Sequence, residues 1–347
     1  MRIEDDIKLT FDDVLIRPKR STLVSRAEVD LSRNFNFKYT DAEWTGVPII
    51  SANMDSTGTF ETAKVLGQMQ VLTALHKFYT VDDWKKQDKN IEFQNIILTI
   101  GSSEEEFSKG IELITLYPKI NFICLDVANG YREDFIDSVS KARDVFSDKI
   151  IIAGNVATRE MTEALLLAGA DIVKVGIGPG SVCTTRNIAG VGYPQLSAIS
   201  ECADAAHGLG GHVIADGGCK YIGDISKAYG AGADFVMLGG MLAGHDESGG
   251  EVITEDDGAI YMEFYGMSSK DAQLKHYGDY QSYRAPEGKK VKLPYKGPIK
   301  ITIKDILGGI RSACSYVGAK NIKALPKCTT FIRVTQTTNE IFSKTEF

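Results

Sequence analysis

The chain has 347 residues, of which 43% are hydrophobic and 24% are charged, as is typical of a folded globular protein. Its formal net charge of −7 argues against a nucleic-acid binder that relies on a basic face. Glycine is enriched, with 34 residues, so several backbone positions are expected to need a left-handed conformation or close approach to a ligand.

The first residues are acidic and lack the apolar core of a secretory signal, and no run approaches the ~20 apolar residues that span a bilayer. The six cysteines are scattered without a CxxC pair, and the five histidines show no zinc-ligand spacing. These features predict a cytoplasmic protein with reduced thiols and no zinc site.

The first 45 or so residues precede the first predicted strand and carry a basic patch at 17–21. From Gly46 to Gly240 the chain repeats one unit, a short apolar run followed by a turn and a helical stretch. Continuous apolar runs are typical of parallel strands buried on both faces. We expect eight strands, at 47–51, 71–75, 95–100, 121–126, 150–154, 170–175, 212–216 and 235–239.

Helical patterns lie between the runs, for example at 158–168, 195–209 and 221–229. Eight alternating units predict an α/β protein with a closed (β/α)₈ TIM barrel, forming one domain over residues 1–347. A doubly wound open sheet is the alternative, but no break in composition divides the chain.

Residues 241–300, here named the excursion, interrupt the eighth unit before its helix resumes near residue 303. The first half is acidic, with short strands expected around 251–253 and 261–264, and the second half is basic and polar. An insertion this long after strand eight is expected to form a flap over the active site.

Polar residues and glycines gather where the predicted strands end, which is where a barrel keeps its active site. Asp216-Gly217-Gly218 and Gly239-Gly240 follow strands seven and eight, the usual phosphate-binding position in barrels. Glycines that merely form tight turns are the alternative.

The loop at 175–186, which follows strand six, holds Cys183 among glycines, hydroxyl residues and Arg186. Its Gly176-x-Gly178-x-Gly180 spacing resembles a dinucleotide fingerprint, but Pro179 and the lack of a following apolar helix argue against that function. Amide donors and a nearby cation would favour a nucleophilic thiolate at Cys183. A packed, inert cysteine is the alternative.

This loop is similar to the catalytic loop of the IMP dehydrogenase/GMP reductase family. Matching segments follow in the same order along nearly the whole chain, at 9–18, 51–55, 125–130, 215–218, 237–241 and 265–269. The sequence resembles the reductase branch more closely, because no regulatory module separates the second and third strands and because of residues 181–183, 266–269, 283–289 and 330–334. Pro286 departs from that pattern and is expected to stiffen the flap.

The resemblance implies that GMP and NADPH react to give IMP, ammonia and NADP⁺ through a covalent thioimidate. Cys183 would be the nucleophile, and Thr185 with Glu287 would form the acid/base pair that protonates the departing ammonia. The implied substrate-binding residues are Asp216, Gly217, Gly218, Gly239, Gly240, Gly266, Met267, Ser268, Arg284, Ala285, Pro286 and Gly288.

The resemblance also implies a dinucleotide site that is partly shared across a subunit boundary of a homotetramer. Its residues would be Ser25, Arg26, Lys77, Asp126, Val127, Ala128, Ile177, Gly178, Ser312, Ala313, Cys314 and Ser315. A potassium ion would be held in the catalytic loop by Gly178, Gly180, Cys183 and Arg186.

Two other functions remain open at this point. An IMP dehydrogenase without the regulatory module would use the same cysteine and a water-activating Arg–Tyr pair, for which Tyr283-Arg284 has the residue types in reversed order. A non-catalytic nucleotide-sensing barrel would keep the phosphate glycines without needing Cys183.

Overall fold

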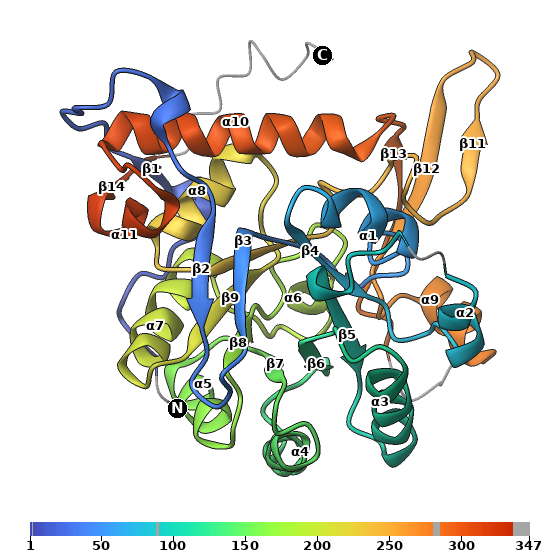
Figure 1. Ribbon diagram of the computed structural model, residues 1–347. Coiled ribbons are helices and arrows are strands. Elements are labelled where there is room, and N and C mark those ends of the chain that lie inside the picture. The colour runs from blue at the N-terminus through green and yellow to red at the C-terminus, as the bar shows by residue number, and fades with distance from the viewer. Residues whose placement is uncertain (2, 88–89, 280–284, 336–347) are drawn as a thin grey trace.

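The computed structural model describes residues 1, 3–87, 90–279 and 285–335. Eight parallel strands close into a barrel, because β10 pairs with β3 as well as with β9 (Figure 1). The barrel strands are β3 (Glu43–Ser51), β4 (Val71–Leu75), β5 (Ile96–Ile100), β6 (Phe122–Asp126), β7 (Ile150–Val156), β8 (Ile172–Val175), β9 (His212–Asp216) and β10 (Phe235–Leu238).

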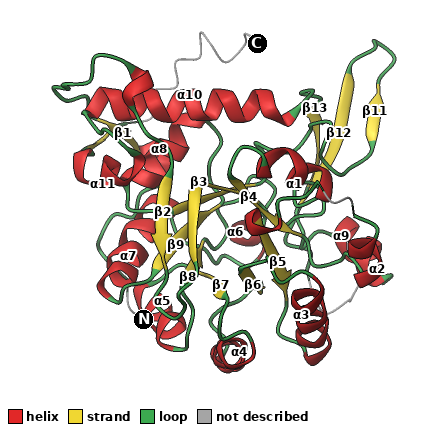
Figure 2. Ribbon diagram, viewed as in Figure 1, coloured by secondary structure: helices red, strands yellow, loops and turns green. Residues whose placement is uncertain are grey.

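The predicted (β/α)₈ barrel is confirmed, and each of the eight apolar runs is a barrel strand. Alternate residues such as Ile97 and Phe122 pack together in the interior, while their neighbours Leu98 and Ile123 pack with residues of the surrounding helices. Figure 2 shows these helices around the strands. Because both faces are buried, the strands show no alternation of polar and apolar residues.

The helices expected at 158–168, 195–209 and 221–229 are confirmed, whereas the last barrel helix, α10, is longer than expected. It begins after Pro298 and ends at Gly318, whose φ of 74° is left-handed. The helices are α1 (Phe60–Gly67), α2 (Val81–Lys85), α3 (Glu104–Leu116), α4 (Glu133–Val145), α5 (Arg159–Leu167), α6 (Thr185–Ile188), α7 (Gln195–Gly208), α8 (Ile222–Gly230), α9 (Lys270–Tyr277), α10 (Ile299–Val317) and α11 (Leu325–Cys328). Among the residues that the structure describes, no helix is long and apolar enough to cross a membrane.

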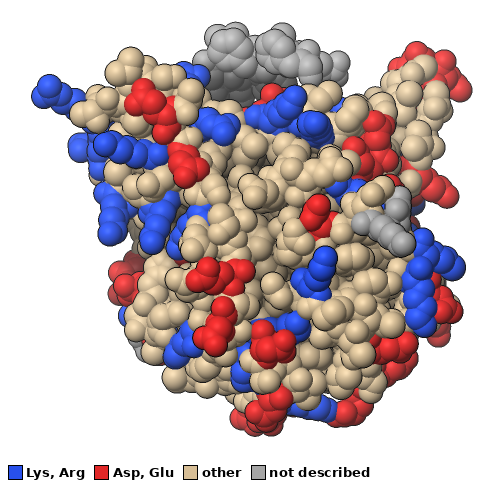
Figure 3. Space-filling model, viewed as in Figure 1, with Lys and Arg blue, Asp and Glu red and all other residues tan. Residues whose placement is uncertain are grey.

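The segment before the barrel is ordered by pairing with later parts of the chain. Strand β1 (Val14–Ile16) pairs with β14 (Phe331–Arg333), and β2 (Arg33–Asn36) pairs with β3 at the N-terminal end of the barrel. Aromatic side chains pack there, and the rings of Phe35 and Phe235 stack with centroids 4.3 Å apart. In Figure 3, Lys and Arg side chains gather at the upper left, where Figure 1 places β1 and α11.

The excursion forms a three-stranded antiparallel sheet and helix α9. The strands are β11 (Val252–Thr254), β12 (Ile260–Tyr265) and β13 (Lys290–Pro294). The first two were expected from the sequence, whereas α9 and β13 were not. The β11–β12 hairpin projects from the barrel at the upper right of Figure 1, and Figure 3 shows acidic side chains over it.

Candidate active site

The loop after β8 presents Cys183 at the C-terminal end of the barrel. Gly178 has a φ of +77°, which favours glycine, and the amide of Cys183 donates to the carbonyl of Gly180 at 3.1 Å. Val182 is buried against Ala243 and Phe264 of the excursion. The loop is thereby fixed on both sides of a partly exposed thiol.

The excursion brings Glu287 to this loop. Backbone hydrogen bonds join Lys289 to Val182 (2.9 Å) and Thr184 to Glu287 (3.0 Å), and Cys183 forms a β-bridge with Gly288. As a result, the hydroxyl of Thr185 donates to Oε2 of Glu287 at 2.6 Å, and Sγ of Cys183 lies 3.2 Å from the same hydroxyl. The three predicted catalytic side chains therefore form one hydrogen-bonded chain.

Two glycines of the excursion allow this close approach. A Cβ added at Gly266 would meet the carbonyl oxygen of Val182 at 3.0 Å, and one added at Gly288 would meet the amide of Ser269 at 2.9 Å. The amide of Glu287 donates to the carbonyl of Ser268 at 3.1 Å. The predicted purine-side residues of 266–268 and 285–288 thus lie beside the cysteine loop.

A buried lysine lies between two of the predicted binding carboxylates. Nζ of Lys174 is 2.6 Å from Oδ1 of Asp126 and 2.9 Å from Oδ2 of Asp216, and its side chain is 4% exposed. Burial alone lowers the pKa of Lys174, but the two carboxylates outweigh burial and raise it well above its ordinary value. The lysine therefore stays charged and fixes one carboxylate on each side.

Sequence analysis assigned no role to Lys174 or Asn155, which both hold Asp216. The side-chain amide of Asn155 donates to Oδ2 of Asp216 at 2.8 Å and to the carbonyl of Gly176 at 2.9 Å. The position of Lys174 inside an otherwise apolar strand could have indicated a buried ion pair, since charged side chains are rarely buried unless they are paired.

The predicted phosphate turns converge on the same end of the barrel. Gly217 and Gly218 have φ values of +87° and +90°, and a Cβ at Gly217 would meet Gly180 of the cysteine loop at 3.3 Å. A Cβ at Gly240 would meet Oγ of Ser181 at 3.1 Å. Both glycine turns therefore lie against the cysteine loop, and free backbone amides at turns of this kind are what an anion site uses.

The predicted dinucleotide residues fall into two separate groups. Asp126 ends β6 and is followed by Val127 and Ala128. Lys77 follows β4, where its ammonium lies 3.5 Å from Glu106. Ser25 and Arg26 lie at the 3₁₀ helix η2 (Arg26–Glu28), which packs on α10, the helix that carries residues 312–315. Figure 1 places that end of α10 beside β1 and α11, away from strands β11–β13.

Several predicted residues have restricted roles in this geometry. The side chain of Cys314 is buried in the core, so only the neighbouring residues of α10 can present side chains to a ligand. Arg186, predicted at the potassium site, donates to the carbonyl of Tyr193 at 2.6 Å.

Two predicted or considered residues of the flap, Arg284 and Tyr283, lie outside the described residues. Within the described part of the chain, no group of His, Cys, Asp and Glu side chains could hold a metal ion.

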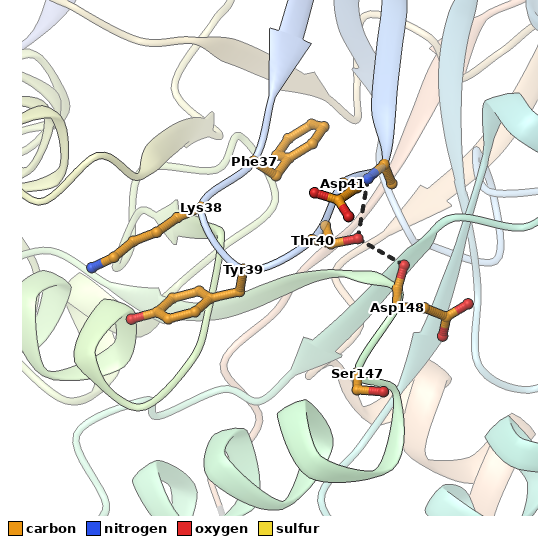
Figure 4. Close-up of a pocket in the computed structure, with 8 residues that line it drawn as sticks. Phe37, Lys38, Tyr39, Thr40, Asp41, Ser147 and Asp148 are labelled. Carbon is orange, nitrogen blue, oxygen red and sulfur yellow. Dashed lines mark hydrogen bonds between the residues drawn. The ribbon is translucent and has the colours of Figure 1, made fainter.

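A cavity of about 570 Å³ lies at the opposite end of the barrel (Figure 4). It is lined by the turn between β2 and β3 and by Ser147 and Asp148, and the hydroxyl of Thr40 donates to the carbonyl of Asp148 at 2.9 Å. This cavity contains none of the predicted site residues. Barrel enzymes keep their chemistry at the C-terminal ends of the strands.

Comparisons with known proteins identify the family of the chain. The family model described as "IMP dehydrogenase / GMP reductase domain" matches residues 8–341. The chain is 58% identical over 346 residues to proteins named GMP reductase from Salmonella paratyphi C, Shigella boydii serotype 4 and Citrobacter koseri, covering 99% of this chain and 99% of each relative. The chain therefore belongs to the IMP dehydrogenase/GMP reductase family.

Proposed function

We propose that this protein is an NADPH-dependent oxidoreductase that converts GMP to IMP and ammonia, with Cys183 as the nucleophile. The hydrogen-bonded chain from Cys183 through Thr185 to Glu287 carries the proposal, because it provides a thiol and a proton relay at one point. The names of the 58% identical relatives support the same reaction.

The relay supplies the proton that the leaving group needs. The thiol proton passes through the hydroxyl of Thr185 to the carboxylate of Glu287, which leaves a thiolate to attack carbon 2 of the purine. As the bond from carbon 2 to the amino nitrogen breaks, Glu287 returns that proton through Thr185, and neutral ammonia departs. A thioimidate joins Cys183 to the purine, and atoms and charge balance.

When bound, NADPH supplies the hydride that reduces carbon 2. Cys183 then leaves as a thiolate, IMP is released, and one proton from solvent restores the thiol. Asp126, ionised because Lys174 lowers its pKa despite burial, faces the mouth of the barrel with 30% of its side chain exposed. A carboxylate that a buried lysine holds in place, and that is partly exposed, would accept hydrogen bonds from the hydroxyl and amide groups of a nicotinamide riboside.

The glycine turns would hold the nucleotide. Asp216 would accept the ribose hydroxyls, and the amides of Gly217, Gly218, Gly239 and Gly240 would bind the phosphate. The excursion would act as the flap over the purine through residues 266–268 and 285–288. Arg284, which the resemblance also implies as a substrate-binding residue, directly precedes the second of these segments.

The catalytic loop would also hold a potassium ion. Carbonyl oxygens of Gly178, Gly180 and Cys183 lie within six residues, and hard cations take oxygen ligands. The Gly180 carbonyl accepts one hydrogen bond, from Cys183, and so keeps a second lone pair. A cation held there would fix the loop that presents the thiol.

The dinucleotide site would be completed by another subunit of a homo-oligomer, for which a tetramer is the expected form. Ser25, Arg26, Ser312 and Ser315 support this arrangement because they gather on η2 and α10, apart from Lys77 and Asp126. Arg26 and Lys77 would favour the 2′-phosphate of NADPH.

A two-nucleotide assay tests the function. The purified protein is mixed with GMP and NADPH, and separately with IMP and NAD⁺, while the absorbance of the reduced cofactor is followed. Consumption of NADPH only with GMP is expected. Production of NADH only with IMP would assign the dehydrogenase reaction instead, and binding of GMP without turnover of either nucleotide would assign a sensor.

A further inference from the structure

One buried carboxylate oxygen of the barrel accepts three hydrogen bonds from the excursion. Oδ2 of Asp55, in the loop between β3 and α1, accepts hydrogen bonds from the hydroxyl of Tyr265 (2.6 Å), Nε2 of His276 (2.8 Å) and Nζ of Lys275 (2.9 Å). All three donors belong to the excursion, more than two hundred residues away in the sequence. The proposed mechanism assigns no role to any of these four residues.

Contacts around Asp55 hold the same part of the excursion. The ring of His276 stacks on Phe78, with centroids 3.6 Å apart and planes 8° apart, so α9 also rests on the loop after β4. The amide of Gly249 donates to the carbonyl of Ser56 at 2.9 Å, and a Cβ there would meet the carbonyl oxygen of Asp55 at 2.3 Å. The excursion is therefore docked on two barrel loops at the edge of the site.

The side-chain oxygens of Asp55 bind the excursion and not the barrel, among the residues that the structure describes. Its Oδ1 is buried and finds no hydrogen-bond partner among the residues that the structure describes, whereas Oδ2 accepts three. Burial alone raises the pKa of Asp55, but the three donors outweigh burial and lower it, so the group is charged at neutral pH. Within the described residues, every side chain that hydrogen-bonds to Asp55 belongs to the excursion, so this buried charge holds the excursion in place.

A short covalent and hydrogen-bonded path runs from Asp55 to the proposed acid. Tyr265 is followed directly by Gly266, which packs against Val182 and Gly288. Ser268 then accepts the amide of Glu287 at 3.1 Å. A shift of Tyr265 would therefore move residues 266–268, which hold Glu287 where its carboxylate lies 2.6 Å from the hydroxyl of Thr185.

We propose that Asp55 is a positioning residue that holds the segment from β12 to α9 in the place where Glu287 meets Thr185. For its effect on turnover, the inference rests on the proposed function. Asp55 touches neither Cys183 nor the proposed substrate residues 216–218, so it acts through Glu287 rather than on the reacting atoms.

The test compares Asp55→Asn with Asp271→Asn, a matched change on α9 at a carboxylate whose partner is Lys290. In Asp55→Asn we expect kcat to fall about 10- to 100-fold, because a misplacement of about 1 Å costs that much. Hydrogen exchange should quicken at the amide of Glu287, which donates to Ser268, and at the amide of Ser269, which donates to Gly266, while exchange in the barrel strands stays as in the wild type. Asp271→Asn should change neither quantity.

A double-mutant cycle separates positioning from general damage. If Asp55 acts through Glu287, Asp55→Asn adds no further loss of kcat in a Glu287→Gln background, whereas independent effects would multiply. Tyr265→Phe, which removes one donor and keeps the ring, should give a smaller loss of the same kind. The proposal would be overturned if the losses of kcat multiplied in the double variant, or if exchange at the amides of Ser269 and Glu287 did not change.

The exchange measurement does not depend on the reaction. If the wild type fails to oxidise NADPH with GMP, the proposed function fails, and faster exchange at Glu287 in Asp55→Asn still supports the positioning role. If the wild type turns over GMP and Asp55→Asn matches it in kcat and exchange, the positioning role fails alone.

Discussion

The two ends of the barrel both bury carboxylates next to cations, but they use them differently. At the N-terminal end, the sequence Gly-Ala-Asp occurs before β8 and before β10, ending at Asp171 and Asp234. Each aspartate accepts the amide of the neighbouring strand, from Ile151 at 2.9 Å and from Val213 at 3.0 Å. Each also pairs with an arginine, and their side chains are 0% and 2% exposed.

At the C-terminal end, Asp126 and Asp216 share Lys174 and remain 30% and 20% exposed. A fully enclosed pair has no oxygen left for a ligand, whereas a half-open pair keeps an oriented acceptor. The comparison teaches that exposure at the strand ends, rather than the presence of an ion pair, separates the binding end from the structural end. Substitutions should therefore affect turnover at one end and stability at the other.

The largest effect is expected at Cys183. In Cys183→Ala, kcat for GMP-dependent NADPH oxidation should fall by at least about 10⁴-fold, since loss of a nucleophile removes the covalent route. Calorimetry should still detect GMP binding with an affinity close to that of the wild type. The control is Cys202→Ala on helix α7, where burial raises the thiol pKa to about 12. Substantial turnover by Cys183→Ala would reject the nucleophile.

The next largest effect is expected at Glu287. Glu287→Gln keeps a partner for the Thr185 hydroxyl but cannot receive and return a proton, so kcat should fall about 10²- to 10⁴-fold. Steady-state assays with GMP check this value. Thermal unfolding should match the wild type, and an unchanged kcat would remove Glu287 from the relay.

At the N-terminal end, Asp234→Asn should reduce the free energy of unfolding by about 3–5 kcal/mol, because Arg33 and His207 lose a buried partner. Urea denaturation measures the loss, and kcat under folding conditions should be unchanged. Asp204→Asn, at a surface pair with Arg159, should stay within about 0.5 kcal/mol of the wild type. If Asp234→Asn lowered kcat and left the free energy of unfolding unchanged, the conclusion that the N-terminal end serves stability would be wrong.

A smaller, pH-dependent effect is expected at His76, which follows β4. Burial lowers its pKa from 6.5 to about 4, so between these values the unfolded chain binds a proton that the folded chain does not. Stability should fall by up to about 3 kcal/mol as the pH drops through that window. His76→Gln should flatten this part of the profile in urea titrations, and an unaltered slope would show that the histidine titrates normally.

The barrel was predictable from local sequence because each strand is apolar on both faces. The run at 96–100, for example, is buried throughout and flanked by turn residues. Helix α9 was not predictable, since Lys270–Tyr277 is mostly polar and is held by Asp55 and Phe78 from distant parts of the chain. Local periodicity carries no information about such long-range contacts.

The site was predictable only in part from the residues themselves. Cys183 and the glycine turns could be identified by their chemistry and their place at strand ends. The pairing of Thr185 with Glu287 rested on the family resemblance, because 102 residues separate them. Lys174 was missed because its partners Asp126 and Asp216 lie on other strands and become neighbours only when the barrel closes.

A crystal structure of the protein with GMP bound tests most directly where the chemistry takes place. We expect the purine at the C-terminal end of the barrel with carbon 2 about 3–3.5 Å from Sγ of Cys183, the separation of a reactive encounter. A nucleotide seated with its base away from this thiol, or in the cavity at the opposite end of the barrel, would contradict the account.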